Sequence, residues 1–372
     1  MRIVIDARLW SESGIGRYIR NLVGQLQELD KENEYFILHL KKEFDGITYK
    51  DNFKGILANF RWYGFAEQLS LPKLLKSLTP DLVHFPHFNV PIFYRGKYVV
   101  TIHDLIHQHF QMRRATTRDP LTYKIKKLGY KKVFSSAVCH AEKILTPSEF
   151  VKKQLLKEWC ANSHRVIVTP EGVEEGFIRL INECKDKDFK RLAEKFGIKK
   201  PYLFYVGNAH PHKNILALIK AFEVVKNMYP DYVLVLSGPS HHFWEQIKKN
   251  SNPRGLIFTG FVTEKELAAL YKNALAFVMP SFEEGFGIPI LEAMAAGCPV
   301  VSSNAASLPE VGGDACLYFD PKKETDMVEK LVQIVGDEKL RKELVAKGNK
   351  RWQEFSWERM AEQTLEVYKN AA

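Results

Sequence analysis

Two glutamates, Glu284 and Glu292, frame a turn that contains two glycines and a proline. The apolar run 275–279 precedes this turn, and a helical pattern over 290–296 follows it. A strand that leads through a Gly-rich turn into a helix start presents backbone N–H groups to an anion. We expect one carboxylate in the turn and the other about two residues inside the helix, where both can accept hydrogen bonds from hydroxyl groups. The pattern therefore predicts a site for a nucleotide sugar, which is a hydroxyl-rich ligand attached to a phosphate.

The residues around this pair resemble the donor-site motif, Glu-x7-Glu, of the retaining glycosyltransferases of family 4. Three flanking segments match as well, at 279–281, 295–301 and 308–311. The resemblance covers about residues 1–370 and is most similar to the bacterial mannosyltransferase branch of O-antigen and exopolysaccharide synthesis. It implies a GT-B fold and transfer of a hexose from a nucleoside diphosphate sugar to an acceptor hydroxyl, with retention at the anomeric carbon.

The resemblance also implies roles for individual residues. Glu284 would contact the transferred sugar, Glu292 the ribose hydroxyls and Lys213 the diphosphate. His103 follows a predicted strand and is the implied active-site histidine, so His103 and Glu284 are the expected catalytic residues. The remaining expected donor contacts are Gly16, Gly207, Val262, Gly285, Phe286, Gly287 and Ile288.

One position departs from the family pattern. Many members have a second phosphate-binding residue, an arginine, directly after the glycine that corresponds to Gly207, and this chain has Asn208 there. His210, His212 or Arg17 could compensate for the missing arginine. We therefore expect Asn208, His212 and Arg17 as phosphate or acceptor contacts.

The run Gly14-Ile15-Gly16-Arg17-Tyr18 resembles a glycine loop that lies against donor phosphate and acceptor in a branch of these transferases. Gly14 is accordingly a further candidate contact. The third position of a GxGxxG motif is occupied by Ile19, so the sequence does not predict a dinucleotide-binding fold here.

A metal site is not expected. Five histidines occur from His84 to His109, both included. His103 and His107 are four residues apart, but no third ligand lies at the spacing of a zinc motif. The segment 186–188 has the form Asp-x-Asp, but it lies in a polar stretch that we expect to be exposed. We predict no cofactor other than the nucleotide-sugar donor.

The expected donor is GDP-mannose, because the glycine loop and the segment 101–105 resemble the mannosyltransferase branch. UDP-glucose and UDP-N-acetylglucosamine remain alternatives. The expected acceptor is a glycan or a lipid-linked glycan. Lys213 and helix amides could stabilise the diphosphate without a divalent ion. The sequence offers no obvious nucleophile, so we favour front-face displacement over a covalent glycosyl-enzyme.

Two other functions remain open at this stage. A GT-B relative could hydrolyse or epimerise a UDP-sugar, although that would need an added acid/base pair in the N-terminal domain. A catalytically inactive protein that binds a nucleotide sugar or a glycan would keep the fold but would not need Glu284, Lys213 and His103, all of which are present.

The chain has 372 residues, of which 45% are hydrophobic, enough for two domains with their own cores. No apolar run approaches the roughly 18–20 residues that cross a bilayer, and the N-terminus is typical of a first strand. Five cysteines without CxxC spacing favour a reduced, cytoplasmic protein.

The formal net charge of +10 is concentrated in part between residues 113 and 132. Apolar residues interleave with the bases there, which is compatible with a basic amphipathic helix. This helix could be a solvated face or could bind an anionic membrane surface on the inner side of the cytoplasmic membrane. Nucleic acid is not an expected partner, because no nucleic-acid motif accompanies the charge. The bases are Arg113, Arg114, Arg118, Lys124, Lys126, Lys127, Lys131 and Lys132.

Short apolar runs alternate with helical patterns along the whole chain, which predicts an α/β protein of two Rossmann-like, doubly wound domains that face each other across a cleft. We expect an N-terminal acceptor-side domain at 1–172, a linker at 173–200, a nucleotide-sugar domain at 201–350, and a helix at 351–372 that returns to the first domain. The predicted strands are 3–5, 35–40, 82–85, 98–102, 143–146, 166–169, 203–206, 233–237, 256–259, 276–279 and 300–302.

Overall fold

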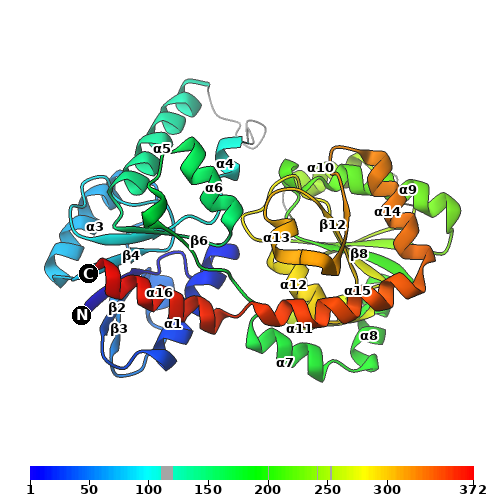
Figure 1. Cartoon of the computed structure of the whole chain (residues 1–372), viewed down its shortest axis with the longest axis horizontal. Coiled ribbons are helices and arrows are strands. Elements are labelled where there is room, and N and C mark those ends of the chain that lie inside the picture. Colours follow the sequence, from blue (N-terminus) through cyan, green and yellow to red (C-terminus); the bar gives the residue numbers. More distant parts are fainter. Residues whose placement is uncertain (110–119, 200, 241, 252–253) are drawn as a thin grey trace. The chain divides into compact units, whose positions relative to one another are not determined.

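The computed structural model describes residues 1–109, 120–199, 201–240, 242–251 and 254–372, and these residues form two compact units (Figure 1). Within them, the first unit holds residues 1–105, 120–171 and 357–372. The second unit holds residues 106–109 and 172–356. Each unit has its own parallel sheet and its own hydrophobic core.

The sheet of the first unit has seven strands in the order β3-β2-β1-β4-β5-β6-β7, and all neighbouring pairs are parallel. Its central strands are short apolar runs that are buried on both faces, as is typical of strands covered by helices. The strands are β1 (Arg2–Asp6), β2 (Glu34–His39), β3 (Phe53–Leu57), β4 (Leu82–Phe85), β5 (Tyr98–Thr101), β6 (Lys143–Thr146) and β7 (Val166–Val168).

The longer helices of the first unit bury apolar residues on one face. In α1 (Gly14–Leu29), for example, Tyr18, Leu22 and Leu26 recur at helical spacing and are buried. The other helical segments are α2 (Lys41–Phe44), α3 (Phe65–Leu78), α5 (Pro120–His140), α6 (Glu149–Glu158), η2 (Ser163–Arg165) and α16 (Trp357–Ala371).

The sheet of the second unit has six parallel strands in the order β10-β9-β8-β11-β12-β13. The strands are β8 (Tyr202–Val206), β9 (Val233–Ser237), β10 (Leu256–Gly260), β11 (Ala276–Met279), β12 (Val300–Ser303) and β13 (Cys316–Phe319). The helical segments are α4 (Ile106–His109), α7 (Glu175–Glu183), α8 (Asp186–Phe196), η3 (Pro211–Lys213), α9 (Ile215–Met228), α10 (His242–Asn250), α11 (Glu264–Asn273), α12 (Ile288–Ala295), α13 (Leu308–Gly312), η4 (Gly313–Ala315), α14 (Glu324–Gly336), α15 (Glu338–Arg351) and η5 (Trp352–Glu354).

The predicted fold class, two doubly wound parallel α/β units, is confirmed. Two strands were not predicted, β3 and β13, and each lies at one edge of its sheet. An edge strand is covered less completely, so its sequence need not be a continuous apolar run. Accordingly β3 carries an exposed lysine, Lys54, and the middle of β13 is only half-buried.

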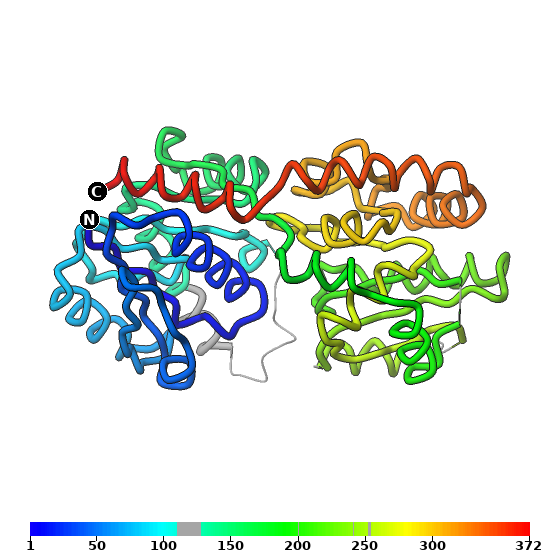
Figure 2. The backbone as a smooth tube through the Cα atoms, turned by 90° about the horizontal axis from the view of Figure 1, so that it is seen from below, coloured from blue at the N-terminus to red at the C-terminus, as the bar shows by residue number. Residues whose placement is uncertain are grey.

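The range 173–200, which we expected to be a linker, contains α7 and α8, and their apolar side chains lie in a core of the second unit. Phe177 and Ile181 of α7 and Leu192 of α8 are all buried there. The polar composition of this range concealed two amphipathic helices, because only one face of each is apolar. At the other end of the chain, α16 packs beside α1 in the first unit (Figures 1 and 2).

The basic segment 113–132 belongs only in part to the described residues. Arg113, Arg114 and Arg118 are outside the described residues, whereas Lys131 and Lys132 of α5 are exposed. Among the helices that the structure does describe, none is long and apolar enough to span a membrane.

Replacing Phe177 by alanine tests whether α7 belongs to the core of the second unit. Because the side chain is 1% exposed, we expect Phe177→Ala to lower the free energy of unfolding by about 3–5 kcal/mol. Urea unfolding followed by circular dichroism measures this change. Lys187→Ala on the exposed face of α8 is the control and should change it by less than about 0.5 kcal/mol. A loss for Phe177→Ala as small as that of the control would contradict the assignment.

Candidate functional site

The predicted donor residues of the second unit gather where its strand order reverses. The chain winds outward from β8 through β9 to β10, returns to β11, and continues to β12 and β13. β8 and β11 are therefore neighbours whose following loops diverge, and such switch points are where open parallel sheets bind ligands. Lys213 lies in the segment after β8, and Glu284 lies in the loop after β11.

Lys213 and Glu284 form an ion pair at this point. The ammonium nitrogen lies 2.6 Å from Oε1 and 2.8 Å from Oε2 of the carboxylate. Both side chains are largely shielded, with exposures of 15% and 10%. The residue expected to bind the diphosphate and the residue expected to bind the sugar thus neutralise each other's charge in this structure. A donor could substitute for both partners of this ion pair. Its diphosphate would pair with Lys213, and its hydroxyl groups would donate to Glu284.

The loop that carries Glu284 is held from two sides. The backbone N–H of Phe282 donates to the carbonyl oxygen of His212 at 2.7 Å, which joins this loop to the segment of Lys213. The hydroxyl of Ser307 lies 2.9 Å from the carbonyl oxygen of Glu284 and 2.7 Å from that of Phe286. The carboxylate therefore rests on a backbone that is fixed at several points.

Gly287 ends this loop and begins α12. Its φ of +115° favours glycine, and an added Cβ would lie 2.9 Å from a methyl carbon of Leu308. Ile288 is the first residue of α12, and the first-turn N–H groups of a helix have no acceptor inside the helix. Gly285, Phe286, Gly287 and Ile288 thus lie together where backbone amides can meet an anion.

Glu292 lies deeper than the sequence predicted, because α12 begins at Ile288 and Glu292 is its fifth residue. Its carboxylate is buried and accepts a hydrogen bond from the hydroxyl of Tyr271 on α11 at 3.0 Å. Tyr271 was not identified from the sequence, because nothing in a helical tyrosine marks the carboxylate that it will contact.

The segment after β8 holds the other predicted phosphate contacts. Gly207 has a φ of +152°, and its N–H donates to the carbonyl oxygen of Ser237 at 3.0 Å. The side chain of Asn208 accepts from the backbone N–H of His210 at 3.2 Å. Val262 is half-buried between β10 and α11. Asn208 therefore orders its own loop.

His212 is buried beside Lys213. Burial, assisted by the charge of Lys213 and by His210, lowers the pKa of His212 to about 3. The ring is therefore neutral at neutral pH. As a phosphate contact it would supply a hydrogen bond and no positive charge, so it cannot replace the charge of an arginine.

His103 follows β5 in the first unit, and both of its ring nitrogens face protein groups. Nε2 lies 2.9 Å from the carbonyl oxygen of Pro86, which can only accept, so Nε2 carries a hydrogen. Nδ1 lies 3.4 Å from Oε1 of Glu171, a buried residue that the sequence analysis did not single out. The ring also meets the edge of Tyr18 at 4.8 Å between centroids. The position of His103 is thus set by three neighbours.

The strand order of the first unit reverses between β1 and β4, and the glycine loop follows β1. Gly16 is buried in the first turn of α1, where an added Cβ would clash with the backbone carbonyl of Trp10. Gly14 is exposed and has open space around it, and Arg17 is half-buried. Sterics therefore require glycine at position 16 and permit a side chain at position 14.

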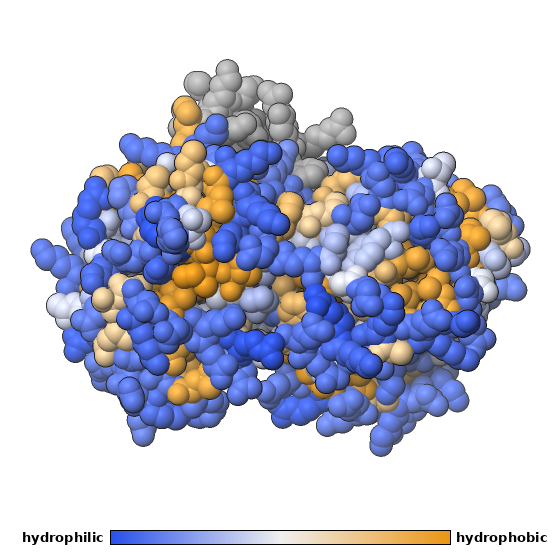
Figure 3. All heavy atoms as spheres, viewed as in Figure 1, coloured by the Kyte–Doolittle hydropathy of each residue, from blue (hydrophilic) through white to orange (hydrophobic). Residues whose placement is uncertain are grey.

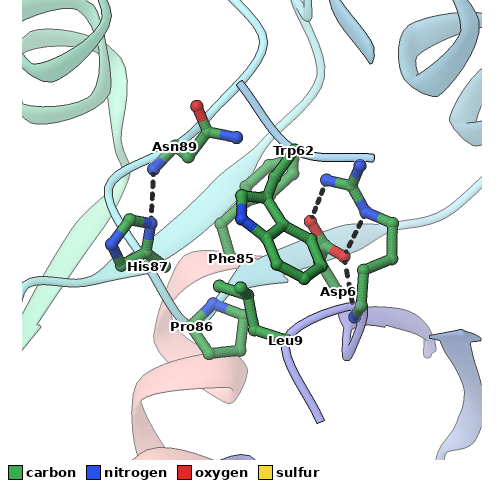
Figure 4. A pocket seen from close by; sticks show the side chains of 8 residues that line it. Asp6, Leu9, Trp62, Phe85, Pro86, His87 and Asn89 are labelled. Carbon is green, nitrogen blue, oxygen red and sulfur yellow. Dashed lines mark hydrogen bonds and ion pairs between the residues drawn. The ribbon is translucent and has the colours of Figure 1, made fainter. Parts of the chain in front are cut away.

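A small pocket lies at the same reversal, lined by the ends of β1 and β4 (Figure 4). Arg8 is buried there and its guanidinium contacts Asp6 at 2.6 Å and Glu67 at 2.7 Å. Burial alone would lower the pKa of Arg8, but these two carboxylates raise it above its ordinary value. The carboxylate of Glu67 also accepts from the side chain of Asn89 at 2.7 Å. The network was not predicted, because Glu67 and Asn89 are far from Asp6 and Arg8 in the sequence.

The side chains of Trp62 and His87 form other parts of the pocket wall, and His87 accepts from the backbone N–H of Asn89 (Figure 4). The space between these side chains is about 10 Å³, which is room for about one water molecule, so the pocket in this conformation does not hold a sugar ring.

The residue before Glu284 also has a side-chain partner. Nδ1 of His109 lies 2.8 Å from both carboxylate oxygens of Glu283, the residue before Glu284. Within the described ranges, no group of three or more His, Cys, Asp or Glu side chains is arranged to hold a metal ion.

The lowered pKa of His212 predicts how acid affects the second unit. The unfolded chain binds a proton near pH 6.5 and the folded chain only near pH 3, so stability is complete above pH 6.5 and falls as the pH drops through this window. At pH 5 the loss from this histidine is about 2 kcal/mol. We expect His212→Asn to flatten the fall in unfolding free energy between pH 7 and pH 5, measured by urea unfolding.

His242→Asn, on the exposed start of α10 in the same unit, is the matched control and should leave the slope unchanged. Equal slopes for the two variants would show that His212 is not held neutral in the folded protein.

Solved structures with the same architecture include one of the Anabaena protein HepE in complex with UDP and glucose. It superimposes with a TM-score of 0.75 and covers 99% of each chain at 16% sequence identity. This likeness shows that the two parallel-sheet units have the GT-B arrangement of elements.

Two proteins with similar sequences are named as mannosyltransferases. The O-antigen chain mannosyltransferase B of Escherichia coli is 30% identical over 96% of this chain and 96% of its own length. The O-antigen chain mannosyltransferase RfbU of Salmonella typhimurium is 27% identical over 71% of this chain and 67% of its own.

Two family descriptions match successive parts of the sequence. Residues 13–177 match "Glycosyltransferase Family 4", and residues 186–351 match "Glycosyl transferases group 1". The second range contains Lys213, Glu284 and Glu292, and the first contains His103 and the glycine loop. The chain is therefore a glycosyltransferase of family 4 with the GT-B fold.

Proposed function

We propose that this glycosyltransferase moves mannose from GDP-mannose to a hydroxyl of a glycan or lipid-linked glycan, with retention at the anomeric carbon. In this proposal the second unit binds the donor and the first unit binds the acceptor. The observation that carries the proposal is the ion pair of Lys213 and Glu284 at the switch point of the second sheet. Its cation matches a diphosphate and its carboxylate matches sugar hydroxyls.

The proposed reaction is a front-face displacement. The acceptor oxygen bonds to the anomeric carbon as the bond from that carbon to the phosphate oxygen breaks, and the acceptor proton passes to an oxygen of the leaving diphosphate. Lys213 and the amides at the start of α12 stabilise the negative charge that grows on the leaving group. Glu284 and His103 position the sugar, and Glu292 accepts from the ribose. None of these steps uses a divalent ion.

The choice of mannose is supported by the names of the relatives. Two sequence relatives that match most of this chain are O-antigen mannosyltransferases. A structure that shares the fold binds UDP and glucose, which keeps UDP-sugars as the alternative donors. The fold and the ion pair suit either nucleotide.

The acceptor is proposed to be lipid-linked, with the protein cytoplasmic and in contact with the inner face of the membrane. Support comes from the net charge of +10 and from apolar side chains that reach solvent on α3. Phe65 is 93% exposed and Leu69 is 59% exposed. Lys73 and Lys76 continue the same face of the helix, since the four positions are separated by four, four and three residues. We call this face the α3 face. Figure 3 shows one side of the molecule, where apolar residues reach the surface of the first unit.

The donor is tested by thermal shift with GDP, UDP, ADP, GDP-mannose and UDP-sugars, each with and without EDTA, followed by turnover of labelled donor. We expect GDP and GDP-mannose to raise the melting temperature selectively, with no effect of EDTA. Lys213→Gln and Glu284→Gln should each lower kcat/KM by about 10²-fold or more, because each removes an interaction with the donor.

Other outcomes of this screen would change the proposed donor, the proposed mechanism or the proposed class of protein. Stabilisation by uridine nucleotides alone would replace mannose by another sugar and keep the mechanism. A requirement for a divalent ion would contradict the proposed leaving-group chemistry. No response to any nucleotide from a folded protein would indicate a glycan-binding protein that is not an enzyme. Thr263→Ala, which removes a helix cap outside the ion pair, is the control for stability effects.

Membrane contact is tested by co-sedimentation with vesicles of phosphatidylglycerol and, separately, of neutral phosphatidylcholine. We expect binding to phosphatidylglycerol alone, weakened several-fold by Phe65→Ser with Leu69→Ser, because these substitutions remove apolar area that would enter the lipid surface. Phe261→Ser in the second unit, at a side chain that is 73% exposed, is the matched control. Equal binding by all three proteins would exclude the α3 face.

A further inference from the structure

A row of buried hydrogen bonds crosses the interior of the first unit and has no part in the reaction proposed above. It joins α1, β4, β5 and α16 through side chains that are each at most 1% exposed. The side chains are Tyr18, His84, Thr101 and Tyr368.

The row begins on α16 and ends on α1. The hydroxyl of Tyr368 on α16 lies 2.6 Å from Nδ1 of His84 on β4. Nε2 of His84 lies 2.8 Å from the hydroxyl of Thr101 on β5, which lies 3.1 Å from the hydroxyl of Tyr18 on α1. We call this row of bonds the α16 circuit.

Each hydroxyl of the α16 circuit has one hydrogen to donate and lone pairs with which to accept, so every bond of the row can be satisfied at once. On α16 itself, the hydroxyl of Thr364 donates to the carbonyl oxygen of Met360 at 2.8 Å.

A neutral imidazole can donate from one ring nitrogen and accept at the other, so His84 can bond to both hydroxyls at once. Burial, with a smaller contribution from His103, lowers the pKa of His84 to about 3, so the ring is neutral at neutral pH. Burial also raises the pKa of Tyr368 well above its ordinary value, so this hydroxyl stays protonated.

The circuit reaches the predicted site through Tyr18. The ring of Tyr18 meets the ring of His103 at 4.8 Å and an interplanar angle of 79°. Tyr18 also lies two residues after Gly16, in the first part of α1. Trp357, the first residue of α16, flanks Tyr18 on another side at 6.3 Å between ring centroids. A displacement of α16 would therefore be felt by His103 and by the glycine loop.

We propose that α16 is a positioning element of the active site, and that Tyr368 acts through the α16 circuit to fix the ring of Tyr18 against His103. The proposal rests on the proposed function, because it takes His103 as a residue that contacts the donor sugar. Tyr368, His84, Thr101 and Tyr18 are positioning residues and touch no substrate. The neighbouring courses of α16 and α1 are visible in Figures 1 and 2.

Tyr368→Phe removes one hydroxyl and keeps the ring. We expect it to lower kcat by about tenfold or more and to change KM for the donor by less than about twofold, because misplaced catalytic geometry slows the chemical step more than it weakens ground-state binding. In ¹⁵N-imidazole NMR spectra of the full-length protein, the signals of both His84 and His103 should shift.

Tyr202→Phe in the second unit is the matched control. Tyr202 is also fully buried and also donates a single hydrogen bond, to the carbonyl oxygen of Leu270 at 2.6 Å. It should lose a similar amount of thermal stability, keep kcat within about twofold, and leave the His103 signal in place. Equal loss of kcat in the two variants, or an unmoved His103 signal in Tyr368→Phe, would overturn the proposal.

Thr101→Val provides a second interruption of the circuit if Tyr368→Phe does not fold. It preserves the shape of the side chain and removes the hydroxyl that joins His84 to Tyr18, so it should also shift the His103 signal and lower kcat. A wild-type protein that transfers no sugar from any donor would defeat the proposed function. The NMR signals would still test the circuit in that case.

Discussion

The reversal of strand order in each sheet is the constraint on which the rest of the structure depends. Between β8 and β11, and again between β1 and β4, successive helices leave toward opposite faces, so the loops at the carboxyl ends of these strands separate. Charged and glycine-containing segments lie at both reversals. The helices and apolar strands around them serve to hold these few loops in place.

Charges at the two reversals are buried but not isolated. Lys213 is paired with Glu284, and Arg8 is paired with Asp6 and Glu67. Removing one partner of a buried pair typically costs about 3–5 kcal/mol, because it leaves the other charge without compensation. The two networks differ in kind: a ligand that brings its own charge and hydroxyl groups could substitute for the first, whereas Arg8 is enclosed by two carboxylates and a carbonyl oxygen.

The sequence predicted the fold class and most strands, because buried parallel strands are continuous apolar runs. It failed at the edge strands β3 and β13, where that pattern weakens, and at α7 and α8, whose polar faces dominate the composition. Individual contacts such as Glu292 with Tyr271 or His103 with Glu171 were not predictable. They depend on the register of packed elements that are distant in sequence, and no local pattern records that register.

The placement of α16 also affects the order in which the protein can be built during synthesis. The first unit contains the N-terminal residues, yet the tyrosine at one end of its buried α16 circuit lies beyond the whole of the second unit in the sequence. A ribosome releases the chain from its N-terminus, so the second unit can finish folding before the first has received its last helix. Until then, the groove that α16 will fill exposes Tyr18 and His84 to water or to a chaperone. The domain that is translated first is thus completed last.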